Sequence, residues 1–149
     1  MPKPAVKILA AKEEDILALA AMNRDLIRDE GSINKMSLPE LEARMKKWLA
    51  GEYKAVLVML GREMIGYCVY KQEPHEYFPG RKRIYIRQYF IKSEHRGRGY
   101  GKAAMEKIIK DQLPKNSEVS VDVLKTNPRG RIFWKKAGFK EYLTNLRRS

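Results

Sequence analysis

Cysteine and histidine are scarce in this chain. Among 149 residues there are one cysteine, Cys68, and two histidines, His75 and His95. A single cysteine excludes an internal disulfide, so a reducing, cytoplasmic setting is the simplest expectation. Only Glu73 and Glu76, beside His75, stand at a spacing that could complete a metal site, so we expect no metal. Nor do two histidines so placed support a Ser-His-Asp triad.

Long apolar runs are also missing. No hydrophobic run reaches the roughly 18 residues that span a bilayer, and residues 1–14 hold no apolar stretch long enough for a secretory signal. We therefore expect no membrane partner. With 44% hydrophobic and 33% charged residues, the composition is that of a folded protein rather than a disordered one. The length suits a single domain, residues 1–149.

Positive charge is concentrated in the second half of the sequence. The net charge is +13, yet residues 1–80 hold 12 basic and 12 acidic residues, whereas residues 81–149 hold 19 and 6. Such asymmetry indicates an anionic partner, which could be a nucleic acid, a membrane surface or a polyphosphate ligand. The alternative is a solvated surface that only keeps the protein soluble.

The hydrophobic periodicity predicts elements in the order βααββ-βαβαβ, an α/β or α+β sheet with helices on both faces. A capping box beginning at Ser37 and the Asn127-Pro128 pair mark two helix starts. Gly61-Arg62 joins two strand-like runs, which predicts a β-hairpin. The strands are expected at 6–9, 54–60, 64–70, 84–91, 119–123 and 139–146, and the helices at 13–31, 37–51, 101–113 and 127–138.

A glycine-rich loop between a predicted strand and helix is the strongest local signal. It reads Arg-Gly-Arg-Gly-Tyr-Gly-Lys over residues 96–102. Glycines let a backbone approach its ligand closely, and free amides at a helix N-terminus attract anions. A Walker loop would need glycine where Arg96 stands and Ser or Thr where Ala103 stands. A dinucleotide fingerprint also fits poorly, because Lys102 replaces a required glycine.

Two motifs together resemble the GNAT superfamily of N-acetyltransferases. Arg96, Gly99 and Gly101 form an R-x-x-G-x-G pattern, and Asn127 precedes an aromatic segment, 133–139, that is similar to a second motif of that family. The order of the predicted elements matches as well. The resemblance covers nearly the whole chain and implies a GNAT-like mixed, mostly antiparallel central sheet of about six to seven strands with helices on both faces.

The resemblance implies acetyl-CoA as cosubstrate, without a metal. The backbone of Tyr89, Phe90 and Ile91 would bind the pantetheine arm, with the Tyr89 amide polarising the thioester carbonyl. Asn127 would hydrogen-bond the pantetheine, or serve only as a helix N-cap. The phosphates would account for the positive second half of the chain. The residues expected to hold them are Arg96, Arg98, Gly99, Tyr100, Gly101 and Lys102.

The acid and the base are less clearly marked in the sequence. Where the family commonly has a tyrosine that protonates the leaving thiolate, this chain has Trp134, whose indole is no useful acid. The candidate bases are Tyr85, expected to share a strand face with Tyr89, and Glu30, which with Asp29 would border the acceptor cleft. An acidic pair there would also attract a protonated amine.

These observations favour an N-acetyltransferase that moves an acetyl group from acetyl-CoA to a primary amine by direct attack in a ternary complex. A nucleic-acid or ribosome-binding module is disfavoured, because the sequence has no aromatic RNA-reading motif. A catalytically inactive coenzyme A-binding protein is the third alternative, since Trp134 replaces the usual acid. The sequence leaves open the identity of the acceptor amine and whether the chain forms a homodimer.

Overall fold

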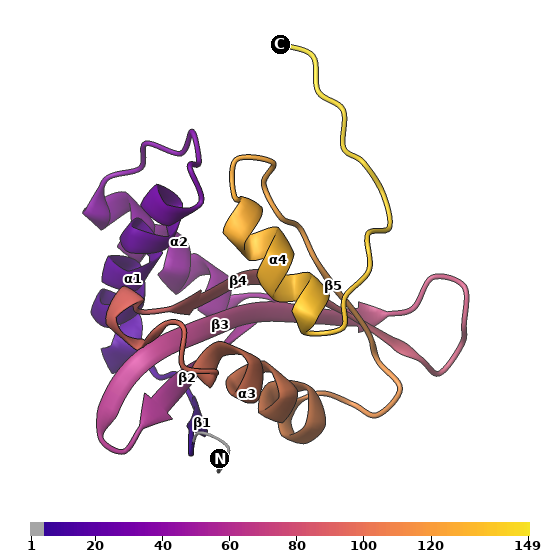
Figure 1. Cartoon of the computed structure of the whole chain (residues 1–149), viewed down its shortest axis with the longest axis horizontal. Helices are drawn as coiled ribbons and strands as arrows, with labels where there is room; N and C mark the ends of the chain where they lie inside the picture. The colour runs from indigo at the N-terminus through magenta and orange to yellow at the C-terminus, as the bar shows by residue number, and fades with distance from the viewer. Residues whose placement is uncertain (1–4) are drawn as a thin grey trace.

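The computed structural model describes residues 5–149 and centres on one mixed sheet (Figure 1). The strand order is β1-β2-β3-β4-β5, in which β4 and β5 are parallel and all other neighbours are antiparallel. The strands are β1 (Lys7–Ala10), β2 (Tyr53–Leu60), β3 (Glu63–Pro74), β4 (Lys82–Ile91) and β5 (Glu118–Val121).

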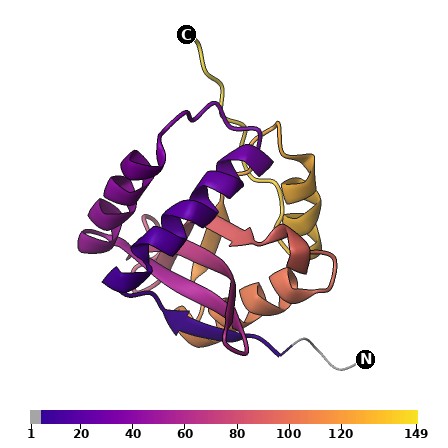
Figure 2. The same cartoon turned by 90° about the vertical axis from the view of Figure 1, so that its left-hand side faces the viewer.

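Helices cover both faces of this sheet, as the sequence predicts. On one face lie α1 (Ile16–Asp29) and α2 (Leu38–Ala50), which Figure 2 shows in front of the strands. On the other lie α3 (Tyr100–Lys107), continued by a wider turn over Ile108–Gln112, and α4 (Pro128–Lys136). The expected capping box starts α2: the Ser37 hydroxyl accepts from the Glu40 amide, and the Glu40 carboxylate accepts from the Ser37 amide.

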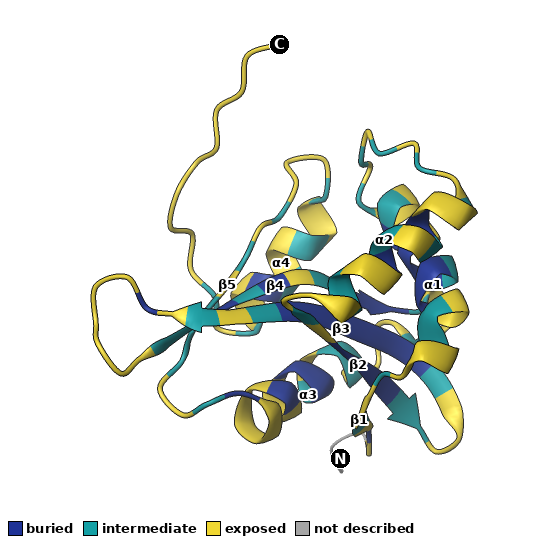
Figure 3. Cartoon of the chain, turned by 180° about the vertical axis from the view of Figure 1, so that it is seen from behind, coloured by how far each residue is buried: buried dark blue, intermediate teal, exposed yellow. Residues whose placement is uncertain are grey.

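The core divides into two layers, one on each side of the central strands β2 and β3, which are buried along the middle of their length (Figure 3). Beneath α1 and α2, residues such as Leu19, Met45 and Tyr67 pack against one face. Beneath α3 and α4, Ile86 and Trp134 belong to the cluster on the other face. Strands covered on both faces have near-continuous apolar sequences, which explains the run from Ala55 to Leu60.

The sheet has five strands within residues 5–149, so the expectation of six to seven strands is wrong. The strand expected at 139–146 is irregular chain that leads away from the body of the molecule (Figure 1). Its apolar residues Tyr142, Leu143 and Leu146 are 72–90% exposed. Tyr142 and Leu143 are adjacent and Leu146 follows two polar residues, so the segment lacks strand alternation and offers no single apolar face to bury.

A one-residue bulge interrupts β4 at Arg87. Val69 of β3 pairs with Gln88, but the next residue, Tyr70, pairs with Ile86, so Arg87 is the extra residue. The bulge reverses the alternation of side chains beyond it. Tyr89 therefore lies on the face that α3 and α4 cover, against the expectation that it shares a face with Tyr85.

Candidate active site

The bulge lies where β4 and β5 separate. Their parallel pairing runs from Arg83 to Ile86 of β4 and then stops, so the following residues of β4 have no partner on that side. The Lys92 amide donates to the Ile65 carbonyl of β3, which fixes the alternation of the ladder. By this alternation Tyr89 and Ile91 turn their backbone groups to the free edge, while those of Phe90 face β3. A free edge of this kind can accept an extended ligand as an added strand.

The glycine loop follows directly and ends in a helix without a side-chain cap. Gly99 stands at the N-cap of α3 with φ +84°, a conformation that glycine adopts without strain. Glycine has no side chain to cap the first-turn amides of Tyr100, Gly101 and Lys102. Arg98 and Lys102 are exposed beside them. The loop therefore leads into a helix N-terminus flanked by exposed positive charge, a geometry that suits an anion.

Gly101 serves the packing between two helices. A Cβ atom at this position would lie 3.0 Å from Cε1 of Phe133, on α4. Next to it, the Tyr89 hydroxyl donates to the Gly101 carbonyl at 2.6 Å, and the Tyr89 ring lies 5.6 Å from that of Trp134. Tyr89 thus connects the free edge of β4 with the start of α3 and with α4. Burial raises the pKa of this tyrosine, so its hydroxyl stays protonated as a donor.

Arg96 belongs to the loop motif but turns toward the α1 side. Its Nε donates to the Ile91 carbonyl at 2.7 Å, and its Nη2 contacts Oδ2 of Asp29 at 2.6 Å. Its guanidinium also lies over the Phe90 ring, 5.2 Å from the centroid. These contacts use the Arg96 side chain to join the end of β4 to the end of α1. Its expected contact with phosphate stays a prediction.

Asn127 has the structural role that the sequence offered as its alternative, and Trp134 belongs to the core. The Oδ1 atom of Asn127 accepts from the Gly130 amide at 3.0 Å, which makes it the N-cap of α4. This cap uses the amide oxygen, so a pantetheine carbonyl would have to accept from Nδ2. Trp134 is 8% exposed, and its ring packs against those of Phe133 and Phe139. It lies in the core between α4 and the sheet.

The acidic end of α1 is largely neutralised by arginines. Arg28 pairs with Asp25 at 3.4 Å and with Asp29 at 3.5 Å, and Arg96 pairs with Asp29 as well. Asp25, Arg28, Asp29 and Phe90 border a hollow of about 250 Å³ between α1 and the start of the loop. The sequence showed Asp29 and Glu30 as an acidic pair. The pairing of Asp29 with Arg96, far along the chain, leaves less charge to attract a cation than the sequence indicated.

Glu30 is in a different environment from Asp29. It follows the last residue of α1 and is partly buried. Burial raises its pKa, Arg87 opposes that rise by its positive charge, and Asp29 adds to it. The carboxyl group can therefore accept a proton more readily than an exposed glutamate. Among the predicted site residues it is the one whose environment suits a general base.

Tyr85 is placed less favourably for that role. Its hydroxyl donates to Oδ2 of Asp122 at 2.9 Å. Burial raises its pKa, and the hydrogen bond to Asp122 and that residue's negative charge raise it further. Tyr85 therefore holds its proton, and a proton-accepting phenolate is disfavoured there.

The structure adds polar residues that the sequence did not single out. Tyr67 is fully buried in β3, and its hydroxyl donates to Oε1 of Gln88 at 2.8 Å. Thr126, in the loop before α4, donates to the Glu30 carbonyl at 2.7 Å and lies 3.2 Å from that of Gly31. This hydroxyl joins the end of α1 to the loop before α4, beside the opening between β4 and β5. These contacts of Thr126 could not be predicted from the sequence, because the partners are 95 and 96 residues apart.

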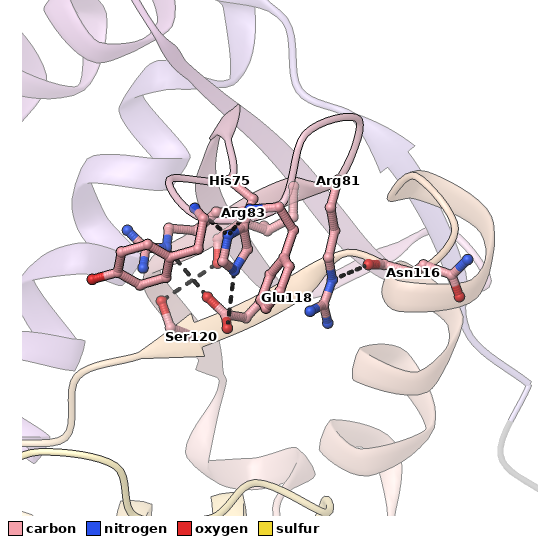
Figure 4. A network of polar contacts seen from close by, with 9 residues as sticks. His75, Arg81, Arg83, Asn116, Glu118 and Ser120 are labelled. Atoms are coloured by element: carbon pink, nitrogen blue, oxygen red, sulfur yellow. Dashed lines mark hydrogen bonds and ion pairs between the residues drawn. The ribbon is translucent and has the colours of Figure 1, made fainter.

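The histidines acquire partners through folding. His95 Nε2 lies 2.9 Å from Glu63, and one ligand atom each of Glu63, Glu94 and His95 fall within 4.8 Å of one another. The set could hold a metal ion, but both carboxylates are exposed. His75 lies in the β3–β4 connection, where its ring accepts from the Tyr77 amide and contacts Glu118, which also binds Arg83 (Figure 4). Sequence spacing could reveal neither set in full, because Glu63 lies on β3 and Glu118 on β5, far in sequence from the histidines that they contact.

Comparisons with known proteins agree with this geometry. The sequence model described as "Acetyltransferase (GNAT) family" matches residues 19–139, so the chain belongs to that family. This result confirms the resemblance inferred from the two motifs. No curated protein matches the chain significantly.

Solved structures share the fold at low sequence identity. A possible acetyltransferase from Clostridium difficile 630 has a TM-score of 0.80 and 17% identity, covering 97% of this chain and 96% of that one. The tetramutant of the BH1408 protein from Bacillus halodurans has a TM-score of 0.78 and 21% identity, with coverages of 96% and 99%. A protein from Clostridium acetobutylicum, described as a predicted acetyltransferase with acetyl-CoA, has a TM-score of 0.75 and 18% identity, with coverages of 97% and 96%. At these identities the likeness establishes the fold alone.

Between residues 5 and 149, none of the helices has both the length and the apolar composition needed to cross a membrane.

Proposed function

We propose that this protein transfers an acetyl group from acetyl-CoA to a primary amine, by direct attack within a ternary complex. The observation that carries the proposal is the meeting of two features: the free edge of β4 after Ile86 and the uncapped N-terminus of α3. An extended pantetheine arm fits the first and a pyrophosphate fits the second. Membership of the GNAT family supports the same assignment.

The residues of the chain have distinct tasks in this proposal. The edge groups of Tyr89 and Ile91 bind the pantetheine, and the Tyr89 amide donates to the carbonyl oxygen as negative charge develops there. The amides that begin α3 and the exposed Arg98 and Lys102 bind the phosphates. The thioester of acetyl-CoA supplies the acetyl group and gives a thiolate as the leaving group.

Proton transfer is assigned to Glu30. A primary amine attacks the carbonyl carbon through its lone pair, the carbon–sulfur bond breaks, and the amine nitrogen must lose a proton. Glu30 accepts that proton directly or through a water molecule, and the thiolate takes a proton from the solvent. Trp134, in the core, is given no chemical task. No covalent enzyme intermediate is required.

The proposal is tested first by binding. Coenzyme A at about 100 times its Kd should stabilise the folded protein by about 2.7 kcal/mol, measured as a rise in Tm. Acetyl-CoA is then mixed with a panel of primary amines while thiol release is followed. A melting shift with single-stranded RNA but none with millimolar coenzyme A would overturn the proposal in favour of nucleic-acid binding. A shift with coenzyme A but no thiol release with any amine would favour an inactive coenzyme A-binding protein.

A further inference from the structure

Two arginines meet at one tryptophan on the α1–α2 side of the sheet. The guanidinium of Arg44, on α2, lies 4.4 Å from the ring centroid of Trp48, and that of Arg87, on β4, lies 5.4 Å from the same centroid. Arg87 is the bulged residue, so its position depends on the irregularity in β4. Two positive groups are thereby held together at the same place in the fold.

Among the described residues, no carboxylate is in ion-pair contact with either arginine, although Glu30 interacts electrostatically with Arg87. Arg44 is half-buried, and its Nη2 donates to Oδ1 of the fully buried Asn23 at 3.1 Å. Its Nε atom is buried and has no hydrogen-bond partner among residues 5–149. Burial lowers the pKa of Arg44, and the nearby charge of Arg87 lowers it further.

An anion bound beside the two arginines would offset the repulsion between their positive charges. Arginine donors match a carboxylate in geometry, and a partly buried site strengthens the attraction. The stacking of Arg44 on Trp48 and its bond to Asn23 fix one guanidinium before any ligand arrives. Arg87 is exposed, so an incoming group can reach it.

The same surface carries the general base assigned above. Glu30 interacts electrostatically with Arg87, and Tyr67 interacts with both Glu30 and Arg44. This surface thus brings a carboxylate and two arginines near one another. This arrangement complements a zwitterion, with its ammonium group toward Glu30 and its anionic group toward the arginines.

We infer that the acceptor is an amine that also carries a carboxylate, as an amino acid does, and that Arg44 and Arg87 bind this carboxylate beside Trp48. The inference rests on the proposed function, since it names the substrate class of that same site. It replaces the expectation of a purely cationic acceptor, because Asp29 is already paired with Arg96 and Arg28.

The first experiment measures binding without turnover. N-acetylated amino acids have no ammonium group, so they isolate the contribution of the carboxylate. A pool of N-acetylated amino acids and the matching pool of their carboxamides are each titrated into the protein. The titration is followed by the indole NMR signals of Trp48 and Trp134, which the Trp48→Phe variant assigns. We expect only the carboxylates to shift the Trp48 signal, and Arg87→Gln to weaken that binding about tenfold or more.

The second experiment measures specificity in turnover. Each amino acid is compared with its carboxamide, which keeps the reactive amine and lacks the negative charge. We expect kcat/KM to favour the amino acids about tenfold or more, mainly through KM, and both Arg87→Gln and Arg44→Gln to reduce the preference. Lys46→Gln, which removes one charge from an exposed position on α2, is the matched control and should leave it unchanged.

The outcomes separate this inference from the proposed function. Carboxylate binding at Trp48 without any acetyl transfer would support the inference and contradict the proposed activity. Transfer to carboxamides as efficient as to amino acids, or a preference that both arginine variants leave intact, would overturn the inference and keep the enzyme. Binding of the carboxamide pool as tightly as the carboxylate pool would overturn it as well.

Discussion

Replacing Glu30 by glutamine removes a proton acceptor while keeping the size of the side chain. Loss of a positioned general base lowers the rate by about 10²–10⁴-fold. At about 1.36 kcal/mol for each factor of ten, this corresponds to about 2.7–5.4 kcal/mol of transition-state stabilisation. We expect kcat/KM to fall accordingly, with the affinity for coenzyme A unchanged.

The pH dependence identifies the group that is responsible. The base must be ionised to accept a proton, and burial raises the pKa of Glu30 above the ordinary glutamate value of 4.5. In the wild type, kcat/KM should therefore rise with pH through a pKa above that value, and Glu30→Gln should lose this acidic limb. A raised folded-state pKa also means that ionisation of Glu30 costs folding free energy as the pH rises through it. The variant should thus melt no lower than the wild type at neutral pH, which separates lost chemistry from lost structure.

Tyr85→Phe is the control for the competing assignment. It removes a hydroxyl that donates to Asp122, and we expect it to leave the acidic limb in place. If Glu30→Gln leaves turnover unchanged while Tyr85→Phe reduces it by a factor of ten or more, the base lies on β4 and the assignment to Glu30 is wrong.

Three further predictions concern the loop, the core and the end of the chain. Gly99→Val should abolish coenzyme A binding in calorimetry and lower the free energy of unfolding by about 1–2 kcal/mol, because valine is strained at φ +84°; a variant that binds normally would show that the loop is not the site. Trp134→Ala should cost about 3–5 kcal/mol in denaturant unfolding, since the ring is buried against three aromatic rings; a loss below about 1 kcal/mol would contradict a core position. Removing residues 143–149 should change the free energy of unfolding by less than about 0.5 kcal/mol, because Leu143 and Leu146 are exposed, whereas a larger loss would mean that they pack.

Local signals predicted the elements that build the site. Ser37 and Asn127 cap helices as expected, and Gly31 has φ +64° just after α1, where the sequence predicts its end. The glycine loop leads into a helix N-terminus as predicted. These successes share a cause: each depends on hydrogen bonds or dihedral angles within a few residues of the signal. The strand expected at 139–146 failed because a strand also needs a neighbour, which a local pattern does not reveal.

The polar chemistry of the site was less predictable, because it depends on residues far apart in the chain. Arg96 was visible as part of the loop motif, but its pairing with Asp29 spans 67 positions. Arg44 and Arg87 come from α2 and β4, and only folding brings both to Trp48. Charge counts along the sequence described the first half as neutral and the end of α1 as acidic. The structure shows arginines from both halves acting on that same region.

In the proposed function, the bulge at Arg87 would let one strand serve both substrates. In a regular strand, side chains at successive positions point to opposite faces, so residues 87 and 89 would share a face. Here the extra residue lets both Arg87 and Gln88 contact groups on the α1–α2 side, namely Trp48 and Tyr67. Tyr89 then lies on the opposite face, where its hydroxyl binds the Gly101 carbonyl at the start of α3. In the proposed function, Arg87 and Gln88 thus lie on the acceptor side of β4, and Tyr89 lies on the side of the cofactor loop. The two substrates would meet at the free edge of the strand, between these two faces.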